Sequence, residues 1–406
     1  MIPICNLNEA ELQKARIACA YMFSPQLAKS NDFLHELDVD RLKKAFREKS
    51  KKYHPDCNRH EHADMAKKRS ERFIKIHNSY KTLNAYVYND TQTLPKRHTD
   101  KGKIIAIGGA KGGIGKSLFA ANLGVLLSNR GLKTVVVDLD LGGANLHLYL
   151  GEKYIHNNIN YFLTKKVSSL QETITHTKYG PLLIGGDSSQ LGAANISFMQ
   201  KLKLLKAIQN IDADYIIIDL GGDTSYNIID FFLAADHGIV MTSCDPASYL
   251  DAYCFIKTAM YRRLNRLFGP ESKRKYPKDD NLKQLIHEFT MSENPSRIDR
   301  IEYFVKKTQR ELPRSLPVLS EAIATFNPCL VVNKVPSNIK EAPIVKRIQD
   351  VSTKMLSVNI RYFGSIPYHL DIEQSASSLV PAVATDSSGI LSKKMNQIID
   401  HLLGHK

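Results

Sequence analysis

Apolar positions along this 406-residue chain follow two different spacings. From residue 103 onward, short apolar runs alternate with longer segments whose apolar residues recur at helical intervals. This alternation predicts a mostly parallel, doubly wound α/β sheet with helices on both of its faces. The predicted strands are 104–107, 134–137, 182–184, 215–219, 238–242, 330–333 and 362–366.

Before residue 90 only the helical spacing occurs. We expect a first helix within Glu9–Phe23. The segment Asp40–Tyr53 places Leu42 and Phe46 on one stripe and basic residues on another, which is typical of an amphipathic helix. A further helical pattern runs from Phe73 to Leu83. The basic residues of the Asp40–Tyr53 helix are Lys43, Lys44, Arg47 and Lys51.

The change of spacing predicts the domain boundaries. We expect a small all-α domain at 1–90 and an α/β domain at 103–406. Between them, at 91–102, polar residues and a proline break the helical pattern and predict a linker.

The segment 108–117 reads Gly-Gly-Ala-Lys-Gly-Gly-Ile-Gly-Lys-Ser and connects a predicted strand to a predicted helix. Its glycines allow backbone N–H groups to point inward, and the helix N-terminus adds positive potential. Lys116 can reach phosphate oxygens, and the Ser117 hydroxyl suits Mg²⁺. The segment therefore predicts a phosphate-binding loop.

Carboxylates follow two of the predicted strands. Asp138 and Asp140 are spaced i, i+2 after the strand 134–137, and Asp219 ends the strand 215–219. Because parallel strands end at the same edge of a sheet, we expect these side chains beside the phosphate-binding loop.

The chain resembles the MinD/ParA ATPases over about 103–406. A second lysine in the loop, Lys111, marks their deviant P-loop. The match continues through the stretches 135–146 and 215–219, and through Leu330–Lys334 with a later Gly364–Tyr368. A further stretch resembles most closely the FlhG/FleN branch, the flagellar-number regulators; it comprises Pro246, Ser248 and Asp251–Tyr253.

This resemblance implies ATP and Mg²⁺ as cofactors. Ser117 would bind Mg²⁺, and Asp138 and Asp219 would hold its waters. Asp140 would orient the attacking water. Lys111 would reach across a two-fold interface to the partner's phosphates, so we expect a homodimer in the ATP state. The residues that the resemblance assigns to the nucleotide are Gly109, Lys111, Gly112, Gly113, Ile114, Gly115, Lys116, Ser117, Leu118, Asn333, Lys334 and Pro367.

One departure concerns the catalytic rate. After Asp219 the chain continues Leu-Gly-Gly-Asp, which places Asp223 where the family has a glycine that senses the γ-phosphate. A carboxylate there would repel a triphosphate. Either Gly222 takes over that position or Asp223 turns away, and we expect slow hydrolysis.

A second resemblance concerns residues 1–90. His54, Pro55 and Asp56 lie between two amphipathic helical segments, an arrangement that resembles a J domain, the module that docks on DnaK-type chaperones. The resemblance implies that these three residues contact the chaperone. The connection Ser24–Glu36 is longer than the family pattern, and an adaptor hairpin without chaperone activity is the alternative.

The formal net charge is +15, with 19 basic against 13 acidic residues in 1–100 and 14 against 8 in 261–316. The second stretch lies where the family fold needs only one helix, so we expect a basic helical insertion. The basic residues that concentrate charge there are Arg262, Arg263, Arg266, Lys273, Arg274 and Lys275. The insertion could bind an acidic protein, an anionic membrane or DNA, or be a solvated surface. No DNA-reading helix pair is recognisable, so specific DNA binding is not expected.

Composition excludes several classes of protein. No apolar run is long enough to cross a bilayer and no secretory signal is present, so we expect a cytoplasmic protein, with transient membrane or polar association left open. Six scattered cysteines fit reduced thiols and argue against an iron–sulfur carrier. We expect the C-terminal apolar stripe, Leu391–Leu402, to pack on the sheet rather than to anchor a membrane.

The resulting hypothesis is an ATP-dependent dimerisation switch that controls the position or number of a cellular structure, flagellar or polar. Two alternatives stay open. One is a J-domain co-chaperone adaptor that brings a DnaK-type chaperone to a client. The other is a DNA-partitioning ATPase.

Overall fold

The computed structural model describes residues 9–37, 39–53, 63–88, 102–186, 196–269, 280–291 and 301–404. The chain forms two compact units, Met1–Lys96 and Arg97–Lys406. Most of the predicted linker lies outside the described residues, as do His54, Pro55 and Asp56.

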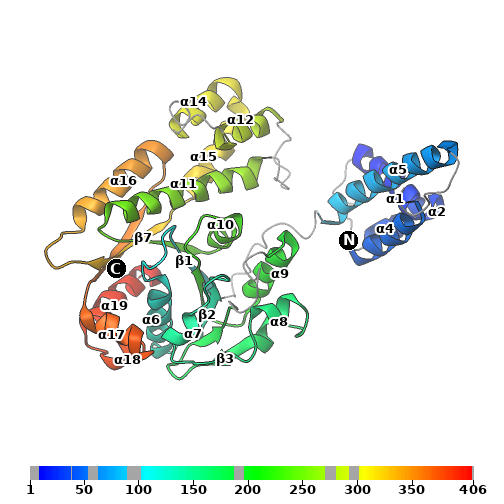
Figure 1. The fold of residues 1–406 in the computed structure, drawn as a ribbon. Coiled ribbons are helices and arrows are strands. Elements are labelled where there is room, and N and C mark those ends of the chain that lie inside the picture. Colours follow the sequence, from blue (N-terminus) through cyan, green and yellow to red (C-terminus); the bar gives the residue numbers. More distant parts are fainter. Residues whose placement is uncertain are drawn as a thin grey trace. The chain divides into compact units, whose positions relative to one another are not determined.

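The first unit is helical in all of its described parts (Figure 1). Its longest helices, α1, α4 and α5, pack around Ala15, Leu42, Ile76 and Leu83. The ring of Phe46 on α4 stacks on Tyr80 of α5 with the centroids 4.2 Å apart. The helices are α1 (Glu9–Met22), α2 (Pro25–Lys29), α3 (Asn31–Glu36), α4 (Val39–Tyr53) and α5 (Ala63–Tyr88).

The segment expected to be a long connection forms two short helices, α2 and α3. Each begins at a serine whose hydroxyl accepts a hydrogen bond from a backbone N–H of the first turn. The Ser24 hydroxyl accepts from the N–H of Leu27, and the Ser30 hydroxyl accepts from the N–H of Phe33. Capping by serine satisfies N–H groups that a helix start leaves unpaired, which explains how so short a sequence becomes helical.

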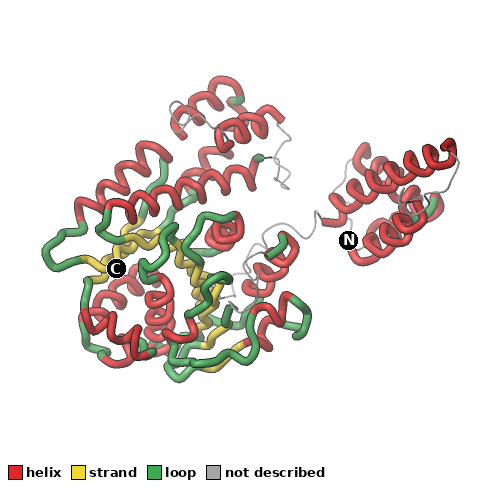
Figure 2. Tube along the Cα trace, in the orientation of Figure 1, coloured by secondary structure: helices red, strands yellow, loops and turns green. Residues whose placement is uncertain are grey.

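In the described part of the second unit an eight-stranded sheet has the order β3-β4-β2-β5-β1-β6-β7-β8 (Figure 2). All neighbouring strands are parallel except β3 and β4. The expected mostly parallel α/β fold is therefore confirmed. The strands are β1 (Lys103–Gly108), β2 (Thr134–Leu139), β3 (Ile174–His176), β4 (Leu182–Ile184), β5 (Tyr215–Leu220), β6 (His237–Thr242), β7 (Cys329–Val335) and β8 (Arg361–Pro367).

Helices cover both faces of the sheet. In β1, Ile105 and Ile107 belong to one core cluster, whereas Ile104 and Ala106 belong to the other. The first face carries α6 (Lys116–Asn129), α7 (Leu146–Tyr149), α17 (Leu370–Ser378), α18 (Ala382–Thr385) and α19 (Ile390–Leu403). The second face carries α8 (Ile159–Leu163), α9 (Phe198–Gln209), α10 (Tyr226–Leu233), α11 (Pro246–Phe268), α15 (Leu316–Ala324) and α16 (Ala342–Leu356).

Helix α19 contains the C-terminal apolar stripe. Its apolar residues are buried against β8 and α6, which confirms that the stripe packs on the sheet. Among the described helices, none combines the length and the apolar character that crossing a membrane requires.

The expected insertion contains α12 (Asp280–Met291) and α14 (Ile301–Glu311), beside the far end of α11. Phe289 of α12 stacks on Phe304 of α14 with the ring centroids 4.7 Å apart, and Tyr261 of α11 lies 5.0 Å from Phe289. These helices therefore extend the core of the second face.

The three arginines expected to form a basic surface bind within the protein instead. Arg262 and Arg266 donate hydrogen bonds to the buried carboxylate of Asp230, at 2.9 to 3.1 Å. Lys201 forms a third ion pair with it. Arg263 donates to the carbonyl of Ala322 and to a neighbouring threonine. These three arginines therefore do not form the expected cationic surface, because two of them bind a buried carboxylate and the third binds α15 and the residue after it. The other basic residues of the expected surface, Lys273, Arg274 and Lys275, lie outside the described residues.

Candidate functional site

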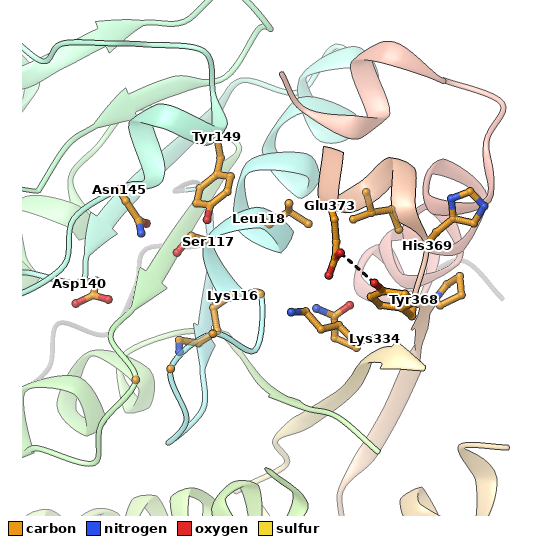
Figure 3. A pocket seen from close by; sticks show the side chains of 17 residues that line it. Lys116, Ser117, Leu118, Asp140, Asn145, Tyr149, Lys334, Tyr368, His369 and Glu373 are labelled. Carbon is orange, nitrogen blue, oxygen red and sulfur yellow. Dashed lines mark hydrogen bonds between the residues drawn. The ribbon is translucent and has the colours of Figure 1, made fainter. Parts of the chain in front are cut away.

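A pocket of about 250 Å³ lies at the carboxyl edge of the sheet (Figure 3). Its walls come from the loop before α6, from the segments after β2 and β5, from the end of β7, and from β8 and α17. The lining residues are Gly112, Gly113, Gly115, Lys116, Ser117, Leu118, Asp140, Asn145, Tyr149, Gly222, Asn333, Lys334, Pro367, Tyr368, His369, Ile372 and Glu373.

The loop between β1 and α6 is held in a shape that requires glycine. Gly113 and Gly115 have φ angles of 73° and 93°, in the left-handed region. A Cβ at Gly115 would lie 2.5 Å from the side-chain nitrogen of Asn333. That nitrogen donates a 2.8 Å hydrogen bond to the carbonyl of Ile114. Asn333 therefore fixes the loop from β7, which lies two strands away from β1 in the sheet.

Lys116, the first residue of α6, is 7% exposed and lines the pocket. Its amine donates a 3.0 Å hydrogen bond to the carbonyl of Lys111, at the start of the loop. Burial lowers the pKa of Lys116, and the carboxylates of Asp219, Asp140 and Asp223 oppose this change. The pocket thus holds a lysine that would gain from a nearby anion.

Two carboxylates meet beneath the loop. Asp138 and Asp219 are register partners on β2 and β5, and both are buried. The oxygens of Asp138 accept hydrogen bonds from the backbone N–H groups of Asp140 (3.1 Å) and Leu146 (3.0 Å). Burial raises the pKa of Asp138 to about 7.

The Asp219 carboxylate has fewer hydrogen-bond partners than that of Asp138. Burial and the neighbouring Asp138 raise its pKa well above the ordinary value, and the nearby Ser117 hydroxyl opposes the change. Within ordinary hydrogen-bond geometry neither of its oxygens has a partner among the described residues. Unpartnered buried carboxylate oxygens beside a serine hydroxyl are a donor set that fits a hard divalent cation such as Mg²⁺.

The segment after β5 settles the question raised by Asp223. Gly222 lines the pocket, and a Cβ there would lie 2.9 Å from the amide nitrogen of Gly112. Asp223 is exposed and accepts a 2.7 Å hydrogen bond from the N–H of Ser225, just before α10. Gly222 therefore lies against the loop while the Asp223 carboxylate serves the start of a helix. Asp140 lines the pocket close to Gly222's neighbour, Gly221.

Lys111 takes a different direction from Lys116. Its amine forms a 2.7 Å ion pair with Asp245 and donates a 3.1 Å hydrogen bond to Ser248. Asp245 is the N-cap of α11, and the hydrogen bond from Lys111 lowers the pKa of Asp245 to about 2. The Lys111 side chain is 42% exposed. Lys111 therefore points out of the pocket, to a surface of its own chain.

Most residues assigned to the nucleotide from the sequence line the pocket, whereas Gly109, Lys111 and Ile114 shape the loop without lining it. Sequence reasoning missed six lining residues. They come from α7 and α17, which approach the loop only through tertiary packing. These residues are Asn145, Tyr149, Tyr368, His369, Ile372 and Glu373. The available signals were the positions of Asn145 and Tyr368, each within a stretch that matched the family.

Comparison with known proteins supports this geometry. Residues 105–382 match the CobQ/CobB/MinD/ParA nucleotide binding domain. The flagellum site-determining protein YlxH of Helicobacter pylori is 38% identical over 157 residues, which cover 38% of this chain and 53% of the relative. The antiactivator FleN of Pseudomonas aeruginosa is 26% identical over 166 residues, which cover 38% of this chain and 55% of FleN. The chain spans about half the length of these relatives.

Among solved structures, the septum site-determining protein MinD of Pyrococcus horikoshii, complexed with Mg-ADP, has a TM-score of 0.48 at 17% identity. The match covers 74% of this chain and 96% of that one. The family match covers more than half of the chain. It includes the glycine-rich loop and most of the strands of the sheet. The chain belongs to the CobQ/CobB/MinD/ParA nucleotide-binding family.

Proposed function

We propose that the protein is a cytoplasmic, ATP-dependent dimerisation switch of the MinD/ParA type that controls the position or number of a cellular structure, flagellar or polar. The observation that carries the proposal is the divergence of two lysines on one loop. Lys116 faces the pocket, whereas Lys111 is partly exposed and turned out of it.

ATP binding would use the chain's own cations and amides. The N–H groups of the loop and Lys116 would neutralise the phosphates. Ser117 would bind Mg²⁺ directly, with Asp138 and Asp219 holding its waters. When bound, Mg²⁺ supplies positive charge to the phosphate oxygens and relieves the repulsion between the two buried carboxylates.

Hydrolysis requires a positioned water more than a covalent partner. Asp140 lines the pocket and its backbone is held by Asp138, so its carboxylate would orient the water. Gly222, packed on the loop, would sense the γ-phosphate in place of the family's glycine. The carboxylate of Asp223 accepts a hydrogen bond from Ser225 but still lies near enough to act on Lys116, so we propose that ATP binds and that its turnover is slow.

Dimerisation would require Lys111 to exchange partners. In the present structure its charge is compensated by Asp245. An exposed ion pair of this kind contributes little stability, so the phosphates of a second subunit, with more charge and several acceptor oxygens, could replace the carboxylate. The catalytic set that we propose is therefore Lys111, Asp140 and Asp219.

The relatives support the choice of process. One is named a flagellum site-determining protein and another an antiactivator, and several are septum site-determining proteins. This agrees with a role in placing a structure rather than in metabolism.

The test is the molar mass of the full-length Asp140→Ala protein with Mg·ATP and with Mg·ADP. We expect a dimer with ATP, because slowed hydrolysis preserves the ATP state, and a monomer with ADP. Asp140→Ala,Lys111→Ala is the control and should stay monomeric with both nucleotides while still binding ATP. A monomeric Asp140→Ala protein under saturating ATP would contradict the switch.

A second candidate function rests on the first unit. Helices α4 and α5 pack against each other on either side of the His54–Asp56 position, and α4 exposes Lys44, Arg47 and Lys51. Such a basic face fits an acidic groove on a DnaK-type chaperone. Single-turnover ATP hydrolysis by that chaperone should be faster with the wild type than with His54→Gln. Equal rates would remove the co-chaperone reading.

The DNA-partitioning alternative gains no support from the described residues. Three residues of its candidate basic surface, Arg262, Arg263 and Arg266, bind Asp230, Ala322 and Thr325 within the protein.

A further inference from the structure

The pocket contains a carboxylate that phosphate binding does not explain. Among the described residues that line it, the acidic ones are Asp140 and Glu373. Asp140 lies beside Gly221, at the end where the loop binds phosphates. Glu373 lies on α17, on the opposite wall with Pro367 and Tyr368 (Figure 3). A carboxylate in a pocket for a polyanion is unfavourable unless the ligand offers it a hydrogen-bond donor.

Glu373 is held in place by its neighbour. The hydroxyl of Tyr368 donates a 3.0 Å hydrogen bond to Oε2 of Glu373. The backbone N–H of Tyr368 in turn donates a 2.9 Å hydrogen bond to the carbonyl of Val335, at the end of β7. The carboxylate is thus anchored to the sheet rather than swinging freely. A carboxylate offers about four acceptor positions, so the bond from Tyr368 leaves capacity for a ligand.

The donor must come from the part of a nucleotide that lies away from the phosphates. With phosphates over Lys116 and Ser117, the nucleobase would extend toward Lys334, Pro367 and Glu373. Lys334, with φ 55°, turns the chain sharply at the end of β7 and lines this part of the pocket. A nucleotide bound in this way has two kinds of donor away from its phosphates, the ribose hydroxyls and the amino group of the base, and only the amino group differs between ATP and the 6-oxopurine nucleotides.

We propose that Glu373, oriented by Tyr368, accepts a hydrogen bond from the 6-amino group of adenine and so selects ATP against 6-oxopurine nucleotides. This inference rests on the proposed function, in which the pocket holds a nucleoside triphosphate. A 6-oxo group would place an acceptor against an acceptor and leave the carboxylate unpaired.

The test is the affinity of the full-length protein for ATP, ITP and GTP with Mg²⁺, measured by competition with a fluorescent ADP analogue. ITP carries an oxo group in place of the 6-amino group of ATP and a hydrogen on N1, so the ratio of their affinities reports on this edge of the base. We expect the wild type to bind ATP about tenfold more tightly than ITP, which corresponds to about 1.4 kcal/mol. Glu373→Gln, whose amide can donate to a 6-oxo group, should reduce the ratio to about threefold or less. Tyr368→Phe should fall between the two.

Asp371→Asn is the matched control. It removes one negative charge from the same helix, and Asp371 is exposed beside His369 without lining the pocket. Its ATP-to-ITP ratio should equal that of the wild type. Because Glu373 is exposed, the glutamine variant should fold, which a melting curve checks.

Two results would overturn the inference while leaving the proposed function intact. The first is an unchanged ratio in Glu373→Gln. The second is a wild-type preference for GTP that Glu373→Gln abolishes, since the carboxylate would then bind the N1 and 2-amino edge of guanine. If none of the three nucleotides bound, the proposed function would fail and this inference with it.

Discussion

The glycine-rich loop and the C-terminal part of α11 are both rich in positive charge in the sequence, yet the fold uses these charges in opposite ways. In the loop, Lys116 faces a pocket. On α11, Arg262 and Arg266 are turned onto Asp230. The loop's turns come from its own glycines, with Asn333 as a distant tether, whereas the arginines are directed by a carboxylate about 30 residues earlier in the chain. A local pattern predicts where a charge points only when its partner is also local.

The largest expected effect comes from removing that carboxylate. Asp230→Ala would leave Lys201 and Arg262 buried without their anion, so we expect the free energy of unfolding to fall by about 3–5 kcal/mol. Denaturant unfolding measures it. Asp245→Ala is the control, because it too removes a lysine's partner but at an exposed site, and its effect on the free energy of unfolding should be much smaller. Equal losses would mean that burial does not distinguish the two regions.

A smaller effect concerns pH. Burial holds the pKa of Asp138 at about 7 and raises that of Asp219, whereas both titrate at about 4 in the unfolded chain. Between these values the native state binds more protons, so the free energy of unfolding from these groups falls as pH rises from about 4 to about 7. The nucleotide-free protein should therefore melt at a lower temperature at pH 8 than at pH 5.5.

Other groups titrate over the same range, so the informative quantity is the difference between variants. In Asp138→Asn the fall in melting temperature from pH 5.5 to pH 8 should be smaller by about 3 °C or more. A slope identical to that of the wild type would show that Asp138 is not the buried acid responsible.

The smallest effect is expected on the exposed part of the insertion. Lys306 pairs with Glu302 one turn away on α14, and its side chain is 71% exposed. Lys306→Ala should change the free energy of unfolding by less than about 0.5 kcal/mol. A loss comparable to that of Asp230→Ala would erase the distinction between buried and surface charges in this region.

The strands of the sheet could be predicted because their apolar runs are buried on both faces. All seven expected segments form strands of the sheet. The exception is β3, which the sequence did not reveal. It has three residues, none of them fully buried, and joins β4 as an antiparallel edge strand. So short and exposed a strand has no distinctive pattern and forms only because β4 offers it hydrogen bonds.

In the candidate site, too, one part could be predicted from the sequence and another part could not. Its phosphate end follows from glycine spacing and from carboxylates at strand ends, which the sequence displays directly. Its opposite end depends on how α7 and α17 pack, so Tyr149 and Glu373 could not be found from local spacing. The partner of Lys111 was also hidden, because Asp245 lies more than a hundred residues away along the chain.

One helix connects the two regions compared above. The cap of α11, Asp245, holds Lys111, and the last turn of α11 abuts α12. With 23 residues this helix is about 35 Å long. A single continuous helix therefore links the residue that holds the loop lysine to the helices of the insertion.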